Sequence, residues 1–252
     1  MKLANSSPPT TEGIVTKTTD ITQPEEFLKA KLAALAEFAA GAGHEINNPV
    51  ATIVGRAELL LKDETNPERR QSLLTIGAQA LRIRDMIGDV MLFGRPPKPE
   101  PKTLDLIVAI DDVCQKLNDS IRAKSMTVRR QGDGAATIWA DETQLRIVIS
   151  NLLINAASAS LPNSTITIEC RSNSLDHKER AIFTINDRGV GFSDLEREHL
   201  FDPFFSGRQA GRGLGFGLPK CWRIVEQHGG RIECDSSPNT GTTFRVFWPK
   251  AA

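Results

Sequence analysis

The sequence predicts an α+β protein of two domains, a helical hairpin that forms a dimeric four-helix bundle and then a two-layer α/β sandwich. Apolar residues step by three and four along two long N-terminal segments, which indicates amphipathic helices. Four prolines between Arg95 and Pro101 predict a stiff linker. Beyond it, short strand-like segments alternate with apolar helical segments, as in a layered fold.

Composition places the chain among ordinary globular proteins. Its 252 residues are 40% hydrophobic and 25% charged, and the formal net charge is +0, so no nucleic-acid partner is expected. No apolar run is long enough to span a membrane and the start lacks a signal-peptide pattern, which predicts a cytoplasmic chain without membrane insertion. The four cysteines show no C-x-x-C spacing, so reduced thiols are expected at Cys114, Cys170, Cys221 and Cys234.

Four segments are predicted along the chain. Residues 1–23 are rich in Ser, Thr and Pro and are expected to be a flexible lead-in. Residues 24–94 form the dimerisation hairpin, 95–102 the linker and 103–250 the second domain. A mere surface loop is the alternative to a domain boundary at 95–102.

The hairpin is expected to turn at Asn66-Pro67. Its first apolar stripe comprises Leu28, Leu32, Leu35, Ala39, Ala42, Ile46, Ile53, Ala57 and Leu60, and its second Leu73, Ile76, Ala80, Ile83, Ile87 and Val90. Pro49 is expected to kink the first helix. Two narrow stripes leave one hairpin without enough partner surface, so pairing with a second copy is predicted.

The second domain is expected to contain helices near 106–123, 145–160 and 217–227. Strands are expected near 126–130, 137–139, 165–171, 180–186, 231–234 and 242–247. Asp141 and Gln144 have the spacing of a capping box. His228, directly before Gly229, is expected to end the last helix rather than to act in catalysis.

The first candidate site is the segment from Gly43 to Pro49, GHEINNP. His44 lies two positions before Ile46, about 200° around a helix, so its imidazole should point away from the apolar stripe. Glu45 can accept a proton from one ring nitrogen while the other attacks. Asn48 follows one turn later on the same face and can bind a water. An ordinary surface histidine is the alternative.

The second candidate site is a pair of asparagines, Asn151 and Asn155, on one face of an apolar helix. Unpaired amides are costly among Leu and Ile, and amide oxygens suit Mg²⁺ bound together with phosphate. Amides that are satisfied inside the core are the alternative.

The third candidate site is the D-x-G-x-G sequence from Asp187 to Gly191, directly after a strand. A buried carboxylate at a strand end can accept a hydrogen bond from an adenine amino group, and Gly189 and Gly191 let the backbone approach the base. A common turn is the alternative.

The fourth candidate site is the glycine-rich sequence from Gly211 to Leu218, which opens a helix. Its amides and the helix dipole favour phosphates, and Arg208 and Arg212 can meet their charge. The spacing fits neither a P-loop nor a dinucleotide-binding fingerprint. A merely flexible loop is the alternative.

In this order, these segments resemble the boxes of the two-component sensor histidine kinases, over roughly Leu28 to Pro249. The segments similar to the H, N, first glycine, phenylalanine and second glycine boxes are those around His44, Asn151–Asn155, Asp187–Gly191, Phe201–Phe205 and Gly213–Leu218. The motifs HExxNP, NLLxNA and IVExHGG are most similar to the nitrogen-regulator-like branch.

The resemblance implies an ATP-binding domain of the histidine kinase/gyrase type. It implies that Mg-ATP phosphorylates His44 and that an aspartate on a response regulator receiver domain then takes the phosphoryl group. Catalytic roles fall on His44, Glu45 and Asn48, the last in phosphatase activity. Nucleotide contacts fall on Asn151, Asn155, Asp187, Gly189, Gly191, Arg208, Gly213, Gly215, Gly217, Leu218 and Thr242, with Mg²⁺ on Asn155 and Asn151. A homodimer is also implied. The residues before the first helix are too few for a sensor domain, so input is expected either from an upstream sensor partner or from sequence outside this chain.

The sequence departs from the family pattern at a few positions. Ser158 stands where a basic residue is frequent, Phe216 replaces a common Leu, and Asn239 replaces a turn glycine. Asn tolerates the left-handed backbone conformation better than most residues do. Two alternatives to the kinase reading remain: a superfamily ATPase without histidine transfer, and a dimeric scaffold without enzymatic activity.

Overall fold

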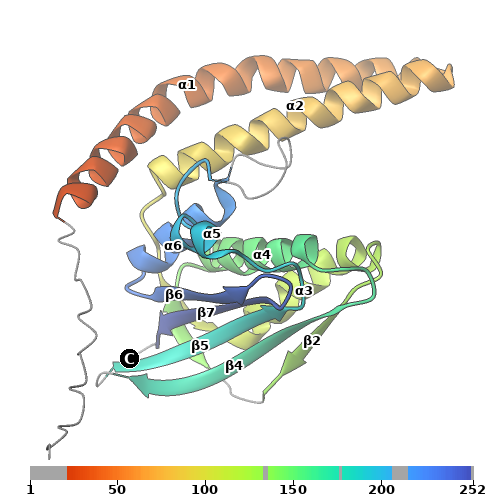
Figure 1. The fold of residues 1–252 in the computed structure, drawn as a ribbon. Helices are drawn as coiled ribbons and strands as arrows, with labels where there is room; N and C mark the ends of the chain where they lie inside the picture. The colour runs from red at the N-terminus through yellow and green to blue at the C-terminus, as the bar shows by residue number, and fades with distance from the viewer. Residues whose placement is uncertain (1–21, 133–135, 176–177, 206–214, 251–252) are drawn as a thin grey trace, which may run out of the picture.

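A computed structural model describes residues 22–132, 136–175, 178–205 and 215–250. Figure 1 shows a long helical hairpin beside a sandwich of helices and a twisted sheet. The predicted order of a hairpin followed by an α/β sandwich is confirmed. The predicted lead-in falls almost entirely outside the described residues.

The hairpin consists of α1 (Thr22–Asp63) and α2 (Pro67–Gly94). The side chain of Asn66 caps α2, since it accepts hydrogen bonds from the N–H groups of Glu68 at 2.9 Å and Arg69 at 3.2 Å. Pro67 occupies the first helical turn, where its missing N–H leaves no gap in the helix ladder. The predicted turn at Asn66-Pro67 is therefore confirmed.

Pro49 lies inside α1, which continues through it as one helix. The sequence predicts a kink there, whereas Figure 1 shows a smooth curve along this helix. The turns beyond the proline stay regular, and the Thr52 hydroxyl donates to the Asn48 carbonyl at 3.1 Å. Loss of a single backbone donor has not interrupted so long a helix.

Only part of each predicted apolar stripe is buried within one hairpin. Ala57 of α1 and Ala80 of α2 are 4% and 3% exposed, and small residues let the two helices approach closely. Larger apolar side chains on the same helices stay 44–61% exposed, namely Ile53, Leu60, Ile76 and Ile83. One hairpin thus presents a second apolar face that it does not itself cover.

The sandwich is built on a five-stranded sheet of order β2-β4-β5-β7-β6. Its strands are β2 (Thr127–Gln131), β4 (Thr165–Leu175), β5 (Lys178–Asp187), β6 (Arg231–Ser237) and β7 (Gly241–Pro249). The β2–β4 pair is parallel and the other pairs are antiparallel. A second sheet joins β1 (Lys102–Asp105) to β3 (Thr137–Ala140).

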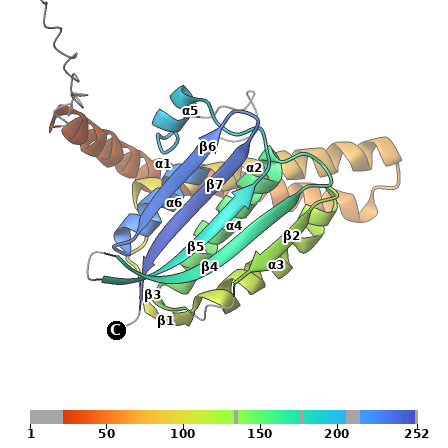
Figure 2. The same ribbon diagram turned by 60° about the horizontal axis from the view of Figure 1, so that its bottom comes forward.

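Three helices cover one face of the large sheet, α3 (Leu106–Arg122), α4 (Glu142–Ala159) and α6 (Gly217–Gln227). Figure 2 shows the sheet in front with α4 and α6 behind it. The short α5 (Asp194–Glu198) follows β5 at the sheet's edge. All predicted strands and helices of this domain are confirmed within a few residues, whereas β1 and α5 were not predicted.

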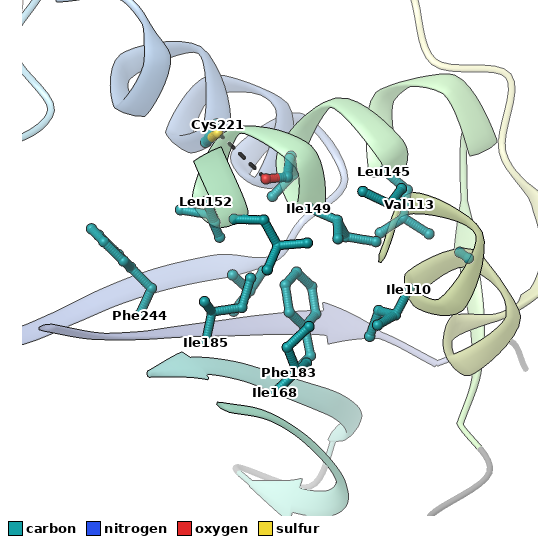
Figure 3. Close-up of a cluster of buried hydrophobic side chains, with 14 of the residues drawn as sticks. Ile110, Val113, Leu145, Ile149, Leu152, Ile168, Phe183, Ile185, Cys221 and Phe244 are labelled. Carbon is teal, nitrogen blue, oxygen red and sulfur yellow. Dashed lines mark hydrogen bonds between the residues drawn. The ribbon is translucent and has the colours of Figure 1, made fainter. Parts of the chain in front are cut away.

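The main core lies between α4 and the sheet. Ile149 and Leu152 on the buried face of α4 meet Ile168 and Phe183 from β4 and β5, as Figure 3 shows. All four side chains are 0% exposed. Burial of side chains of this size contributes about 1.5–3 kcal/mol each, so this layer fixes the position of α4 on the sheet.

The start of α4 is tied to the linker. Asp141 caps the helix by accepting from the Gln144 N–H at 3.0 Å, but the Gln144 side chain donates to the Pro97 carbonyl at 2.9 Å instead of returning to Asp141. Asp141 also accepts from the Glu100 N–H at 3.0 Å. The predicted capping box is therefore only half formed, because the linker takes its second member.

Candidate functional site

The three residues predicted for phosphoryl chemistry lie on the exposed surface of α1. His44, Glu45 and Asn48 are all exposed, whereas Gly43 is buried. A Cβ atom at Gly43 would lie 2.5 Å from Met91 Sδ of α2, so a larger residue there would require the Met91 side chain to move. The predicted orientation of His44 away from the hairpin core is confirmed.

A second site lies at the carboxyl end of β5. Asp187 is 3% exposed, and its Oδ1 accepts a hydrogen bond from the Gly189 N–H at 2.8 Å. Burial raises the pKa of Asp187, while the backbone N–H groups of Gly189 and Thr242 act in the opposite direction on the same pKa. The carboxyl group is thus pinned and largely shielded from solvent.

The backbone around Asp187 is tightly packed at three glycines. A Cβ atom at Gly189 would lie 2.5 Å from the Ala159 carbonyl oxygen at the end of α4. Gly191 has φ +65° and Gly241 has φ +100°, and a Cβ at either would collide with a neighbouring backbone carbonyl. Both turns therefore need glycine for backbone shape and for space.

Thr242 is brought directly beside Asp187 by strand register. The two residues are paired across β5 and β7, and Thr242 is 3% exposed. The Oγ1 atom of Thr242 lies 3.1 Å from Ser236 Oγ on β6. Ser236 also accepts from the Phe192 N–H at 3.0 Å and donates to the Gly241 carbonyl at 2.8 Å.

Ser236 is a site residue that the sequence did not single out. Its one hydroxyl joins the turn after Asp187 to the turn before Thr242. No local pattern marks it, because the strand pairing that brings these turns together is a long-range property. Nearby, Asn239 has φ +62° and its N–H donates to the Val190 carbonyl at 2.7 Å, so the predicted left-handed turn is confirmed.

The two asparagines of α4 face the start of α6. Asn151 Nδ2 donates to the Ile147 carbonyl at 2.8 Å, which fixes the orientation of the amide. A Cβ atom at Gly217 would lie 3.5 Å from Asn151 Oδ1 and 3.8 Å from Asn155 Nδ2. The structure thus brings three of the predicted nucleotide residues together at one helix N-terminus, where anions are favoured.

The remaining glycine-box residues lie close by or outside the described residues. Gly215 has φ +75° and lies against the backbone of Phe204 and Phe205. Leu218, in the first turn of α6, packs against the core with its side chain half-buried. Arg208, Arg212 and Gly213 lie outside the described residues.

His228 serves structure at the C-terminal end of α6, as expected. Its Nδ1 lies 2.8 Å from the Ile224 carbonyl, and its Nε2 accepts from the Asp141 N–H at 3.1 Å. The ring also contacts Trp248, with 4.7 Å between centroids. Both ring nitrogens are thus occupied by backbone groups of the sandwich.

The predicted free thiols are confirmed at all four cysteines. Burial raises the pKa of Cys114 and Cys170 to about 11 and that of Cys221 and Cys234 to about 12. Within the described ranges, no three or more His, Cys, Asp or Glu side chains cluster as a metal site. None of the helices in those ranges has an apolar stretch long enough to cross a bilayer.

Two family models match the two halves of this arrangement. Residues 34–98 match the His Kinase A (phospho-acceptor) domain. Residues 140–252 match the histidine kinase-, DNA gyrase B- and HSP90-like ATPase. The hairpin with His44 is therefore a phosphoacceptor domain, and the sandwich is an ATP-binding domain of this ATPase type.

Curated relatives with both domains are sensor kinases. The chain is 31% identical over 224 residues to the sensor histidine kinase ZraS of Klebsiella oxytoca, covering 88% of this chain and 47% of the relative. It is 28% identical over 235 residues to the sensor kinase CckA of Brucella abortus, covering 87% of this chain and 25% of the relative. The chain belongs to the two-component sensor histidine kinases, and it spans half or less of these two relatives.

Solved structures of histidine kinases share the fold. Full-length ShkA in complex with AMPPNP superposes with a TM-score of 0.75 at 21% identity, covering 86% of this chain and 47% of that chain. The Acinetobacter baumannii histidine kinase AdeS gives a TM-score of 0.57 at 17% identity, covering 83% and 98%. The predicted nitrogen-regulator-like branch stays a prediction.

Proposed function

We propose that this chain is a kinase core that transfers the γ-phosphoryl group of ATP to His44 and then to an aspartate on a response regulator receiver domain. The observation that carries the proposal is an exposed histidine with an adjacent carboxylate on a phosphoacceptor hairpin, in the same chain as an ATPase domain. A superfamily ATPase without histidine transfer has no need of such a hairpin.

The adenine end of ATP is assigned to the carboxyl end of β5, at Asp187. A buried carboxylate held by backbone N–H groups can accept from the exocyclic amino group of adenine. Gly189 and Gly191 form the tight turn directly after Asp187, and the backbone of this turn is proposed to meet the base. Thr242, in register with Asp187, contributes a hydroxyl beside the same carboxylate.

The phosphate end is assigned to the junction of α4 and α6. The backbone at Gly215, Gly217 and Leu218 presents a helix N-terminus to the phosphates, and Arg208 and Gly213 complete this set by family resemblance. Amide oxygens are hard ligands, and Asn151 Oδ1 faces the start of α6, so Asn155 and Asn151 fit a Mg²⁺ ion. The ion would neutralise phosphate charge during transfer.

On the hairpin, His44 is the nucleophile and Glu45 its proton acceptor. The neutral form of the imidazole has a free ring nitrogen for attack on the γ-phosphorus. Asn48 lies one turn further along the same exposed face, where its amide can orient a water toward a phosphoaspartate on a docked regulator. Phosphatase activity is therefore part of the proposal.

The partners follow from the same surfaces. The exposed apolar side chains Ile53, Leu60, Ile76 and Ile83 support a homodimer that completes a four-helix bundle. The exposed α1 face around His44 is proposed to receive the regulator. We place the chain in the cytoplasm, where ATP is available, with its input from an upstream sensor partner.

A labelling experiment tests the proposal. Wild-type protein incubated with Mg²⁺ and γ-labelled ATP should gain acid-labile label, and His44→Gln should gain none while its nucleotide affinity stays within about twofold of wild type, since the two sites lie on separate domains. Unlabelled wild-type protein that still hydrolyses ATP would favour the superfamily ATPase instead.

A further inference from the structure

The hairpin and the sandwich are joined by a contact between α2 and α6. The Asp89 carboxylate forms an ion pair with the Lys220 ammonium group, and Phe93 packs on Phe216 with ring centroids 5.5 Å apart. Asp89 and Phe93 are four residues apart and share one face of α2. Phe93 and Phe216 are each 1% exposed, so the contact is tightly closed.

This contact lies at the level of the phosphoacceptor along the hairpin. Met91, between Asp89 and Phe93 in the sequence, packs against Gly43, the residue before His44. Residues two positions apart lie on nearly opposite faces of a helix. One turn of α2 therefore contacts α1 beside His44 on one side and α6 on the other.

The same end of α6 faces the proposed phosphate site. Phe216 is the N-cap of α6, and Gly217 directly follows it against Asn151 and Asn155. Phe216 also meets Phe204, with ring centroids 4.8 Å apart and nearly perpendicular. The contact with α2 is thus one residue away from the backbone that would meet the phosphates.

Because of this ion pair, the contact between α2 and α6 depends on the charge of a single side chain. The Lys220 side chain is 10% exposed and the Asp89 side chain 38% exposed. Among the described residues, Asp89 is the one ionic partner that the structure gives Lys220. Removal of one member of a shielded pair leaves the other charge uncompensated, which disfavours the docked arrangement.

We propose that Asp89 is a positioning residue for phosphoryl transfer. Its ion pair with Lys220, together with the Phe93–Phe216 contact, holds the phosphate end of the nucleotide site at the level of His44. This inference rests on the proposed kinase function. It places the role of Asp89 in the transfer step rather than in ATP binding, because Asp89 lies outside the pocket that binds the base.

Replacement of Asp89 by Asn tests this role at nearly constant volume. The rate of His44 labelling at saturating ATP should fall about tenfold or more, since small misplacements of reacting groups are costly. The KM for ATP and the affinity for a fluorescent ATP analogue should stay within about twofold of wild type. The exchange Asp89→Lys with Lys220→Asp should recover most of the rate.

Asp85→Asn is the matched control. Asp85 lies one turn earlier on α2, its side chain is 72% exposed, and its ion pair is with the adjacent Arg84 at 3.4 Å. Its labelling rate should equal that of wild type. A pair of spin labels at Thr52 and Leu161 adds a readout independent of chemistry, and Asp89→Asn should broaden the interdomain distance distribution.

Three results would overturn the inference while leaving the kinase function intact. The first is a labelling rate unchanged in Asp89→Asn, and the second is a faster rate, which would make the contact a restraint. The third is an exchanged pair that stays as slow as the single variant. A wild-type chain that takes no label on His44 overturns the proposed function and this inference together.

Discussion

Asp187 is buried, and its proposed hydrogen bond to adenine needs the ionised carboxylate, so ATP affinity should depend on pH. Burial raises the pKa of Asp187 above the usual range of an aspartate. In the proposed site the ionised carboxylate accepts a hydrogen bond from the adenine amino group, so a proton on Asp187 would compete with the nucleotide. ATP affinity should therefore fall as pH decreases through the raised pKa, at a higher pH than for an ordinary aspartate.

The measurement is calorimetric or fluorescence titration of nucleotide at a series of pH values. Asp187→Asn should bind more weakly at neutral pH and should lack the acidic step, because its side chain does not titrate. A wild-type affinity that stays constant down to the pKa of a free carboxyl group would remove Asp187 from the adenine pocket.

We expect Asn48 and Glu45 to separate two proposed activities on one face of α1. Asn48→Ala should keep most autophosphorylation and lose dephosphorylation of the regulator, because its amide orients a water but takes no proton. Glu45→Ala should slow autophosphorylation by about 10²-fold or more, as expected when a general base is lost.

Both variants are compared in a labelling time course and in regulator dephosphorylation with Mg²⁺ and a non-hydrolysable ATP analogue. If Asn48→Ala dephosphorylates the regulator normally, Asn48 has no role in that reaction.

Among single residues, those that belong to a short sequence motif could be predicted. Asp187, its two glycines and the Asn151–Asn155 pair stand in recognisable spacings, and the structure brings each set together. Ser236 could not be predicted, since two of its three partners lie on β7 and the third in the turn after β5. Asp89 was equally hidden, because its partner Lys220 is far away in the sequence.

At the scale of single elements, α4 packs on the sheet and also carries Asn151 and Asn155 of the proposed phosphate site. Leu152 is 0% exposed and packs over the sheet, so Leu152→Ala should lower the free energy of unfolding by about 2–5 kcal/mol. Ile154, two residues later, is 48% exposed, and Ile154→Ala should cost about 0.5 kcal/mol or less. Urea denaturation followed by circular dichroism compares them.

The length of an element decided whether it could be predicted. The stripes of α1 and α2 extend over many turns, so their periodicity is strong. β1 has four residues and α5 has five, which are too few to show the two-residue period of a strand or the 3.6-residue period of a helix. α5 does carry a local sign, because Ser193 and Glu196 form a complete capping box, with Ser193 N–H donating to Glu196 Oε2 at 2.8 Å.

For the whole molecule, dimerisation is the property that the hairpin most clearly requires. Ile53 is 44% exposed on the apolar face that one hairpin leaves uncovered, so Ile53→Asp should shift the chain toward monomer. Leu161→Asp is the control, because Leu161 is 67% exposed on the sandwich, away from that face. Sedimentation velocity at several concentrations reports both, and a monomeric wild-type chain would contradict the bundle.

The linker that was expected to connect two independent bodies is largely part of one of them. Hydrogen bonds from Gln144 to Pro97 and from Glu100 to Asp141 hold the linker against the sandwich from Pro97 to Glu100. The joint is therefore confined to Arg95 and Pro96, and the successive prolines Pro96 and Pro97 restrict the backbone there. A connection this short transmits rotation instead of acting as a flexible linker. A rotation of α2 about its axis would therefore rotate the sandwich relative to the hairpin.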